Sequence, residues 1–132
     1  MHSRRRELRI EVMKKLFEYS IKNEYNDDDF SSDEQKKFFL DIINNLTKID
    51  DVISANLVNY RLDRLSLIDQ AIIRIATFEM LFTNIEHRII INEAIEITKE
   101  YSNLDDSKQH KFNNKVIDNI SKKVREQTTN CI

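Results

Sequence analysis

LDRLSLIDQAIIRIATFEML, residues 62–81, indicates the architecture of this chain more strongly than any other segment. Apolar side chains recur in it at helical spacing, and further apolar residues widen the surface that they form. A helix that is apolar over so much of its circumference must be surrounded by other helices. The stretch therefore predicts the central helix of an all-α domain. Glu79 falls on the same spacing, so we expect it to be partly buried, to need a partner and to be structural.

Length and composition indicate one soluble domain over residues 1–132. The chain is 40% hydrophobic, which suits a globular fold with one core, and no run approaches the roughly 20 apolar residues that cross a membrane. Its N-terminus is basic but lacks the apolar segment of a secretory signal. The single cysteine, Cys131, cannot form an internal disulfide, and a reducing cytoplasm fits this composition.

The composition also removes most catalytic and metal-binding motifs. The chain contains no glycine, so phosphate-cradling loops, dinucleotide fingerprints and glycine-flanked nucleophile elbows are absent. Three aspartates at 27–29 lack the alternating ligands of a calcium loop, and the three histidines lack zinc-ligand spacing. No serine, threonine or cysteine has a recognisable base partner. We therefore expect no enzymatic activity, no cofactor and no metal.

Amphipathic spacing predicts three helices before the central one. The first covers residues 4–22, and its apolar stripe comprises Leu8, Val12, Met13, Leu16, Phe17 and Ile21. A capping box formed by Ser32 and Gln35 starts the second helix, whose apolar face extends to Ile49. The third is predicted at about residues 51–60.

Two more helices are predicted after the central one. One ends near Tyr101, with its core face formed by Ile91, Ala94, Ile95 and Thr98, and the last covers about 111–125. Because the chain has neither glycine nor proline, we expect asparagines such as Asn84 and Asn103 at left-handed helix ends.

The charge pattern suggests an anionic partner. Arg4, Arg5, Arg6 and Arg9 crowd the first turns of the predicted N-terminal helix, where each opposes the helix macrodipole by roughly a few tenths of a kcal/mol. Such a cluster favours a polyanion, most simply RNA phosphate, although a solvated basic tail is the alternative. A second basic segment contains Lys108, Lys111, Lys115, Lys122, Lys123 and Arg125.

Four segments together resemble the NusB family of bacterial transcription antitermination factors. They are SRRRELRIEVMKKLF at 3–17, LVNYRLDRLSLIDQAIIRIATFEM at 57–80, INEAIEITKEY at 91–101 and HKFNNKVIDNI at 110–120. The resemblance covers nearly the whole chain in the right order. It implies a bundle of about seven helices in two packed halves, about 1–60 and 61–132, with the first three helices against the other four.

The resemblance also implies function. Proteins similar to NusB pair with NusE, a ribosomal small-subunit protein, and bind the boxA element of ribosomal RNA leaders. The complex helps RNA polymerase to resist termination and supports ribosomal RNA synthesis. Some relatives self-associate, so a homodimer is possible. By position in the motifs, the implied RNA-binding residues are Arg4, Arg5, Arg6, Arg9, Asp69, Lys111, Phe112 and Asn114.

Physical roles can be assigned to these residues. The cations would neutralise phosphates, Phe112 would stack on an unpaired base, and Asn114 would read a base edge or cap the helix. Ordinary core packing is the alternative for Phe112. Lys115, Glu86 and Ser102 replace two glycines and a proline of the family pattern, and these departures concern RNA contacts more than the fold.

The sequence is also compatible with two other functions. A helical protein–protein scaffold would have the same fold, with its basic helix a solvated surface and only weak, non-specific RNA binding. A fragment of an RNA cytosine methyltransferase is the third possibility, because such enzymes can have a NusB-like domain at their N-terminus. The chain reaches Ile132 without room for a methyl-donor fold, which argues against that possibility.

Overall fold

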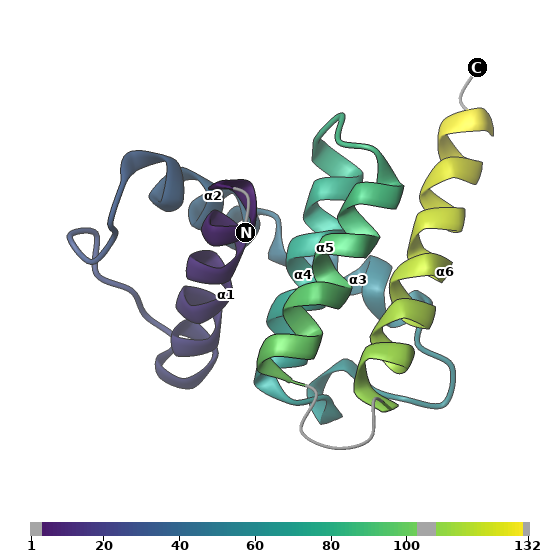
Figure 1. Ribbon diagram of the computed structural model, residues 1–132, viewed down its shortest axis with the longest axis horizontal. Coiled ribbons are helices and arrows are strands. Elements are labelled where there is room, and N and C mark those ends of the chain that lie inside the picture. Colours follow the sequence, from purple (N-terminus) through teal and green to yellow (C-terminus); the bar gives the residue numbers. More distant parts are fainter. Residues whose placement is uncertain (1–3, 103–107, 131–132) are drawn as a thin grey trace.

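The computed structural model describes residues 4–102 and 108–130, and the prediction of an all-α fold is confirmed. Those residues contain six α-helices, one short 3-10 helix and no strand (Figure 1). The elements are α1 (Arg4–Lys22), α2 (Asp33–Asn44), α3 (Leu46–Ala55), η1 (Leu62–Arg64), α4 (Leu67–Phe82), α5 (His87–Tyr101) and α6 (Lys108–Asn130). No helix of the described part is long and apolar enough to cross a bilayer.

The predicted central helix is α4, which contacts each of the other five α-helices. In Figure 1, α1 and α2 lie on one side of the α4–α5 pair and α6 lies on the other. Most of α4 is buried, including Ile73 and Thr77, which have no exposed surface. One hydrophobic core connects all the helices. α3 packs more extensively against α4 than against α2, so it lies against the second half of the chain.

The predicted boundary between the second and third helices is wrong. The helix expected to reach Ile49 ends at Asn44, and α3 covers Leu46–Ala55 instead of residues 51–60. The cause is Asn45, whose side-chain amide donates to the Asp41 carbonyl at 2.7 Å and ends the helix by a local hydrogen bond. Asn56 ends α3 in the same way, by donating to the Val52 carbonyl at 2.8 Å.

The expectation that Asn84 adopts a left-handed conformation is also wrong. Positive φ angles occur instead at Asn23, directly after α1, and at Asn59, with values of 56° and 66°. α4 ends at Phe82 and is capped by Thr83, whose hydroxyl donates to the Glu79 carbonyl at 2.7 Å, so this end needs no left-handed residue. Asn103 lies outside the described residues.

The predicted capping box of α2 and the predicted apolar stripe of α1 are each confirmed in part. Ser32 caps α2 by accepting from the Gln35 N–H at 3.1 Å, as the capping box predicts. The reciprocal bond, however, runs from the Ser31 N–H to Gln35 Oε1 at 2.7 Å. The apolar stripe of α1 is buried only up to Leu16, because Ile21 is 61% exposed at the end of the helix.

Candidate nucleic-acid interface

The arginines at the start of α1 face two carboxylates inside the protein. Arg9 binds Glu79 of α4 through two bonds, from Nε to Oε1 at 2.7 Å and from Nη2 to Oε2 at 3.0 Å. Arg5 Nη2 donates to Glu79 Oε2 at 3.2 Å. Arg6 binds Glu93 of α5, with its Nε 2.8 Å from Oε2, and Arg9 Nη1 lies 3.5 Å from the other oxygen of Glu93. We call these five residues the arginine–glutamate cluster.

Burial in this cluster explains the unusual charge pattern. Arg9 and Glu79 are only 3% and 1% exposed, so the expected partner of Glu79 is found. The hydrogen bond from Arg6 to Glu93 is the main cause that raises the pKa of Arg6 above its usual value. Cations that oppose the α1 macrodipole are therefore compensated by acids on α4 and α5. The negative charges of Glu96 and Glu100 also act on Arg6, so more than two carboxylates surround these three guanidinium groups.

The four arginines predicted to bind RNA thus differ in accessibility. The Arg4 side chain is 87% exposed and forms only a surface pair with Glu34 at 3.6 Å. Arg5 and Arg6 are 40% and 20% exposed, so each retains an outward surface. Arg9 is enclosed, and its guanidinium acts inside the protein.

The start of α6 holds the other predicted contacts at the surface. Lys111 and Asn114 are exposed, and Phe112 is half-buried. The Phe112 ring packs edge-on against Tyr60, with 5.0 Å between the ring centroids and 72° between the planes. Tyr60 is 57% exposed and was not predicted from the sequence as a site residue. The two rings therefore form an aromatic surface beside cations.

Asp69 lies beneath this surface rather than on it. It is 3% exposed and accepts from Ser66 Oγ at 2.7 Å, from Ser102 Oγ at 2.6 Å and from Asn113 Nδ2 at 2.9 Å. Asn113 also donates to Thr98 Oγ1 at 3.1 Å. The carboxylate thus fastens the start of α6 to α4 and to the end of α5, which positions Lys111, Phe112 and Asn114 without exposing Asp69.

Sequence reasoning missed Asn113, although a signal was present. The residue shares a helical face with Val116, Ile117 and Ile120, all of which are buried. Its spacing of three, four and seven residues from them places it on the core side of α6. A polar residue at such a position must find a partner, and here that partner is Asp69.

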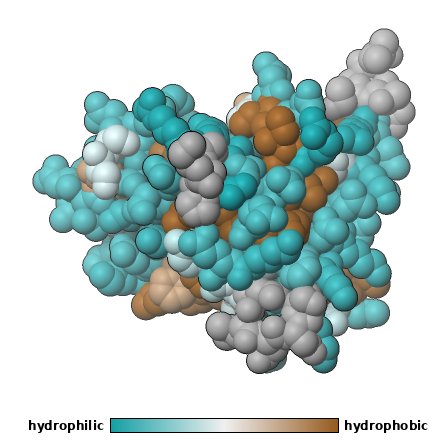
Figure 2. Space-filling view, viewed as in Figure 1, coloured by the Kyte–Doolittle hydropathy of each residue, from teal (hydrophilic) through white to brown (hydrophobic). Residues whose placement is uncertain are grey.

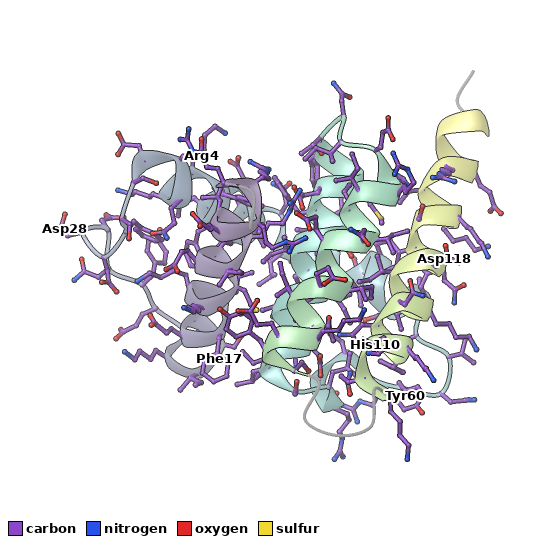
Figure 3. All side chains as sticks on the ribbon, in the orientation of Figure 1. Arg4, Phe17, Asp28, Tyr60, His110 and Asp118 are labelled. Atoms are coloured by element: carbon purple, nitrogen blue, oxygen red, sulfur yellow. The ribbon has the colours of Figure 1, made fainter. Side chains whose placement is uncertain are left out.

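The structure does not bring the two groups of predicted residues into one site. The arginine–glutamate cluster is built on Glu79, and the start of α6 is fastened to Asp69. Ten residues of α4 separate these acids, which corresponds to about 15 Å along the helix axis. Figure 3 shows Arg4 and Tyr60 on opposite sides of the view, and in Figure 2 the surface is mostly hydrophilic with separate hydrophobic patches. A bound strand would have to extend between the two groups.

Metal ligands do not gather in the described residues. No group of three His, Cys, Asp or Glu side chains there is placed to hold an ion. In the acidic loop before α2, Asp29 lies 2.8 Å from Lys15 and Asp27 lies 3.6 Å from Lys36. The Lys15 hydrogen bond is the main cause that lowers the pKa of Asp29. Ion pairs with α1 and α2 therefore account for these two acids.

His87, at the first turn of α5, makes stability depend on pH. Its Nδ1 lies 2.7 Å from Ser121 Oγ of α6, and burial, followed by the charge of Arg125, lowers its pKa below 6.5. Folding therefore favours neutral His87. Its contribution is complete above about pH 6.5 and is lost as the pH falls through the lower folded-state pKa.

Replacing His87 by glutamine removes this titration. We expect the unfolding free energy of the H87Q variant to fall less than that of the parent protein between about pH 7 and about pH 5. Urea denaturation at several pH values measures both proteins. Identical pH dependence in the two would show that His87 does not contribute.

Comparison with known proteins agrees with this architecture. The model of the NusB family matches residues 4–122. The transcription antitermination protein NusB of Bacillus licheniformis is 35% identical over 126 residues, which cover 89% of this chain and 95% of that protein. NusB of Clostridium botulinum is 45% identical over 89 residues, covering 67% and 65%. The solved structure of T. maritima NusB superimposes with a TM-score of 0.78 at 32% identity, covering 92% of this chain and 93% of that one.

Proposed function

This chain belongs to the NusB family of transcription antitermination proteins, and we therefore propose that it is a non-enzymatic RNA-binding adaptor. It binds boxA-type single-stranded RNA of ribosomal RNA leaders and pairs with NusE, a ribosomal small-subunit protein. The pair acts in the RNA polymerase antitermination complex in the cytoplasm. A homodimer would cover part of the RNA-binding surface, and dimer formation would therefore compete with RNA binding.

The observation that supports RNA binding best is the aromatic surface at the start of α6. Phe112 and Tyr60 present two rings in contact, and Lys111, Asn114 and Lys115 are exposed beside Phe112 on the same helix. Proteins hold single-stranded RNA by stacking unpaired bases on aromatic rings while cations follow the backbone. Phe112 also packs against the hydrophobic core, so RNA would stack on the part of its ring that stays exposed.

The arginines of α1 contribute in two ways. Arg4 and the outward surfaces of Arg5 and Arg6 neutralise phosphates. Arg9 is a positioning residue, because its guanidinium is enclosed and holds Glu79. Arg9 and Asp69, both predicted to bind RNA, are buried. We propose that they do not touch the RNA and that they position the residues that do.

Titration of boxA RNA and of a scrambled RNA, with and without NusE and at several salt concentrations, tests the proposal. Replacing Phe112 by alanine should weaken boxA binding by about 1–3 kcal/mol through lost stacking. Lys111→Ala and Arg4→Ala should each reduce the slope of log affinity against log salt by about 0.7. Lys37→Ala, which changes an exposed lysine of α2 paired with Asp41, is the matched control.

The result expected is a preference for boxA that increases when NusE is present. Equal and weak binding to both RNAs, unchanged by NusE and by all three substitutions, would contradict the proposal. It would leave the second candidate, a helical scaffold, which is compatible with the fold but gives no role to the exposed Tyr60 or to the exposed basic residues at the start of α6.

A further inference from the structure

An open pocket of about 540 Å³ lies beside the aromatic surface. It is bounded by the end of α3, by η1 and by the first half of α4, and Tyr60 forms part of its wall. Because Tyr60 also contacts the Phe112 ring, this one residue belongs both to the pocket and to the aromatic surface. None of the residues predicted from the sequence to bind RNA lines it. We call it the Tyr60 pocket.

The charges of the Tyr60 pocket are balanced internally. Arg74 forms two bonds with Asp50, at 2.9 and 3.0 Å. Arg61 donates to Asp63 at 2.7 Å. Two cations thus face two carboxylates, so the pocket offers no net charge to a phosphate. A neutral and polar ligand fits this lining better than an anion does.

Free polar groups remain in the pocket. Gln70 is only 6% exposed, and its Nε2 is used to donate to the Leu65 carbonyl at 2.9 Å. Within residues 4–102 and 108–130 no donor reaches Gln70 Oε1, which is therefore free to accept from a ligand. Ser54, exposed on the last turn of α3, adds a hydroxyl at the edge of the pocket. A planar group with N–H donors would satisfy both.

We propose that the Tyr60 pocket receives one unpaired base of the RNA strand that stacks on Phe112. The inference rests on the proposed function, which it deepens by adding a base-specific contact to a stacking one. The ring of Tyr60 flanks the base, and Gln70 Oε1 accepts from its N–H edge. The pocket volume lies in the usual range for small-ligand sites. Because Tyr60 lines the pocket and also contacts Phe112, neighbouring bases of one strand would lie on the two sides of Tyr60.

Filling the pocket tests the proposal without disturbing Phe112. Ser54→Tyr places a ring in the pocket mouth, and Ala55→Tyr adds the same ring at the neighbouring exposed position, which does not line the pocket. We expect S54Y to weaken binding of boxA RNA by roughly 10- to 100-fold, which is the effect of losing one base contact, and A55Y to bind as the parent protein does. Unfolding midpoints should be compared to confirm that both variants fold.

RNAs with a single abasic site, moved along the sequence, identify the bound base. At one position the abasic RNA should bind the parent protein as weakly as boxA RNA binds S54Y, and the two changes together should weaken binding no further. At all other positions the effects should add.

The outcomes separate this inference from the function on which it rests. If S54Y binds RNA normally while Phe112→Ala binds weakly, the pocket receives no base, and the proposed function stands. If S54Y weakens only the binding of NusE, the pocket receives a protein side chain, and the inference is overturned. If neither variant changes RNA binding and boxA is not preferred, the proposed function itself fails.

Discussion

Replacing Glu79 by glutamine is expected to lower the unfolding free energy by about 3–5 kcal/mol. The carboxylate binds Arg9 through two bonds and Arg5 through a third, and the neutral amide of glutamine leaves the enclosed Arg9 with Glu93, 3.5 Å away, as its charged partner. A buried charge without its partner costs about this amount. Since the unfolding free energy of a typical domain is about 5–15 kcal/mol, the variant would keep only part of the parent protein's stability. Urea denaturation measures the loss.

Two further variants make the result specific. Glu11→Gln removes an exposed carboxylate of α1, 3.7 Å from Lys14, and should change stability by no more than about 0.5 kcal/mol. The double variant R9M/E79M, which removes the buried pair and fills its volume, should recover much of the loss, because apolar replacements for buried ion pairs are often neutral. A loss below about 1 kcal/mol in E79Q would show that the arginine–glutamate cluster contributes little to folding.

Replacing Asn113 by alanine is expected to have the second largest effect, about 2–3 kcal/mol. Its amide donates to the Asp69 carboxylate and to Thr98, and hydrogen bonds to charged groups contribute about 1.5–3 kcal/mol. The loss leaves a buried carboxylate with one partner fewer. Because Asn113 fastens α6, RNA binding should also weaken, although Asn113 has no exposed surface.

The adjacent Asn114 provides the matched control. It is exposed, so Asn114→Ala should change the unfolding free energy by less than about 0.5 kcal/mol while still weakening boxA binding. Denaturation curves and RNA titrations of the two variants should therefore separate a positioning role from a direct one. If N114A is the more destabilised variant, the assignment of the two asparagines is wrong.

The fold could be predicted from the sequence because periodicity is a local property. The 62–81 stretch is apolar on nearly every face, and α4 is indeed the helix that all others surround. The boundary near Asn45 could not be predicted, since continuous apolar spacing across residues 38–49 hides a break made by one side-chain hydrogen bond. Periodicity shows which residues are buried but not where an asparagine turns back onto the chain.

The site could be predicted only in part. Lys111, Phe112 and Asn114 are assigned to RNA binding by the resemblance to the NusB family and not by their spacing, and the structure places Lys111 and Asn114 at the surface and Phe112 half-buried. The arginines of α1 were understood as surface charge, because Glu79 and Glu93 lie far away in sequence and no local pattern pairs them with α1. Tyr60 was overlooked for the same reason, as only the folded chain brings it against Phe112. Contacts between distant helices therefore decide which predicted residues remain accessible.

The arginine–glutamate cluster also has a consequence for the order of events during synthesis. Glu79 follows Arg9 by 70 residues, and Glu93 follows it by 84. At about 5–20 residues per second, the ribosome makes Glu79 roughly 4 to 14 s after Arg9. Throughout that interval α1 has neither its acids nor the α4 surface that covers its apolar stripe. The first helix to be synthesised is therefore among the last to be completed, and the nascent chain displays a basic amphipathic segment until most of the protein has been made.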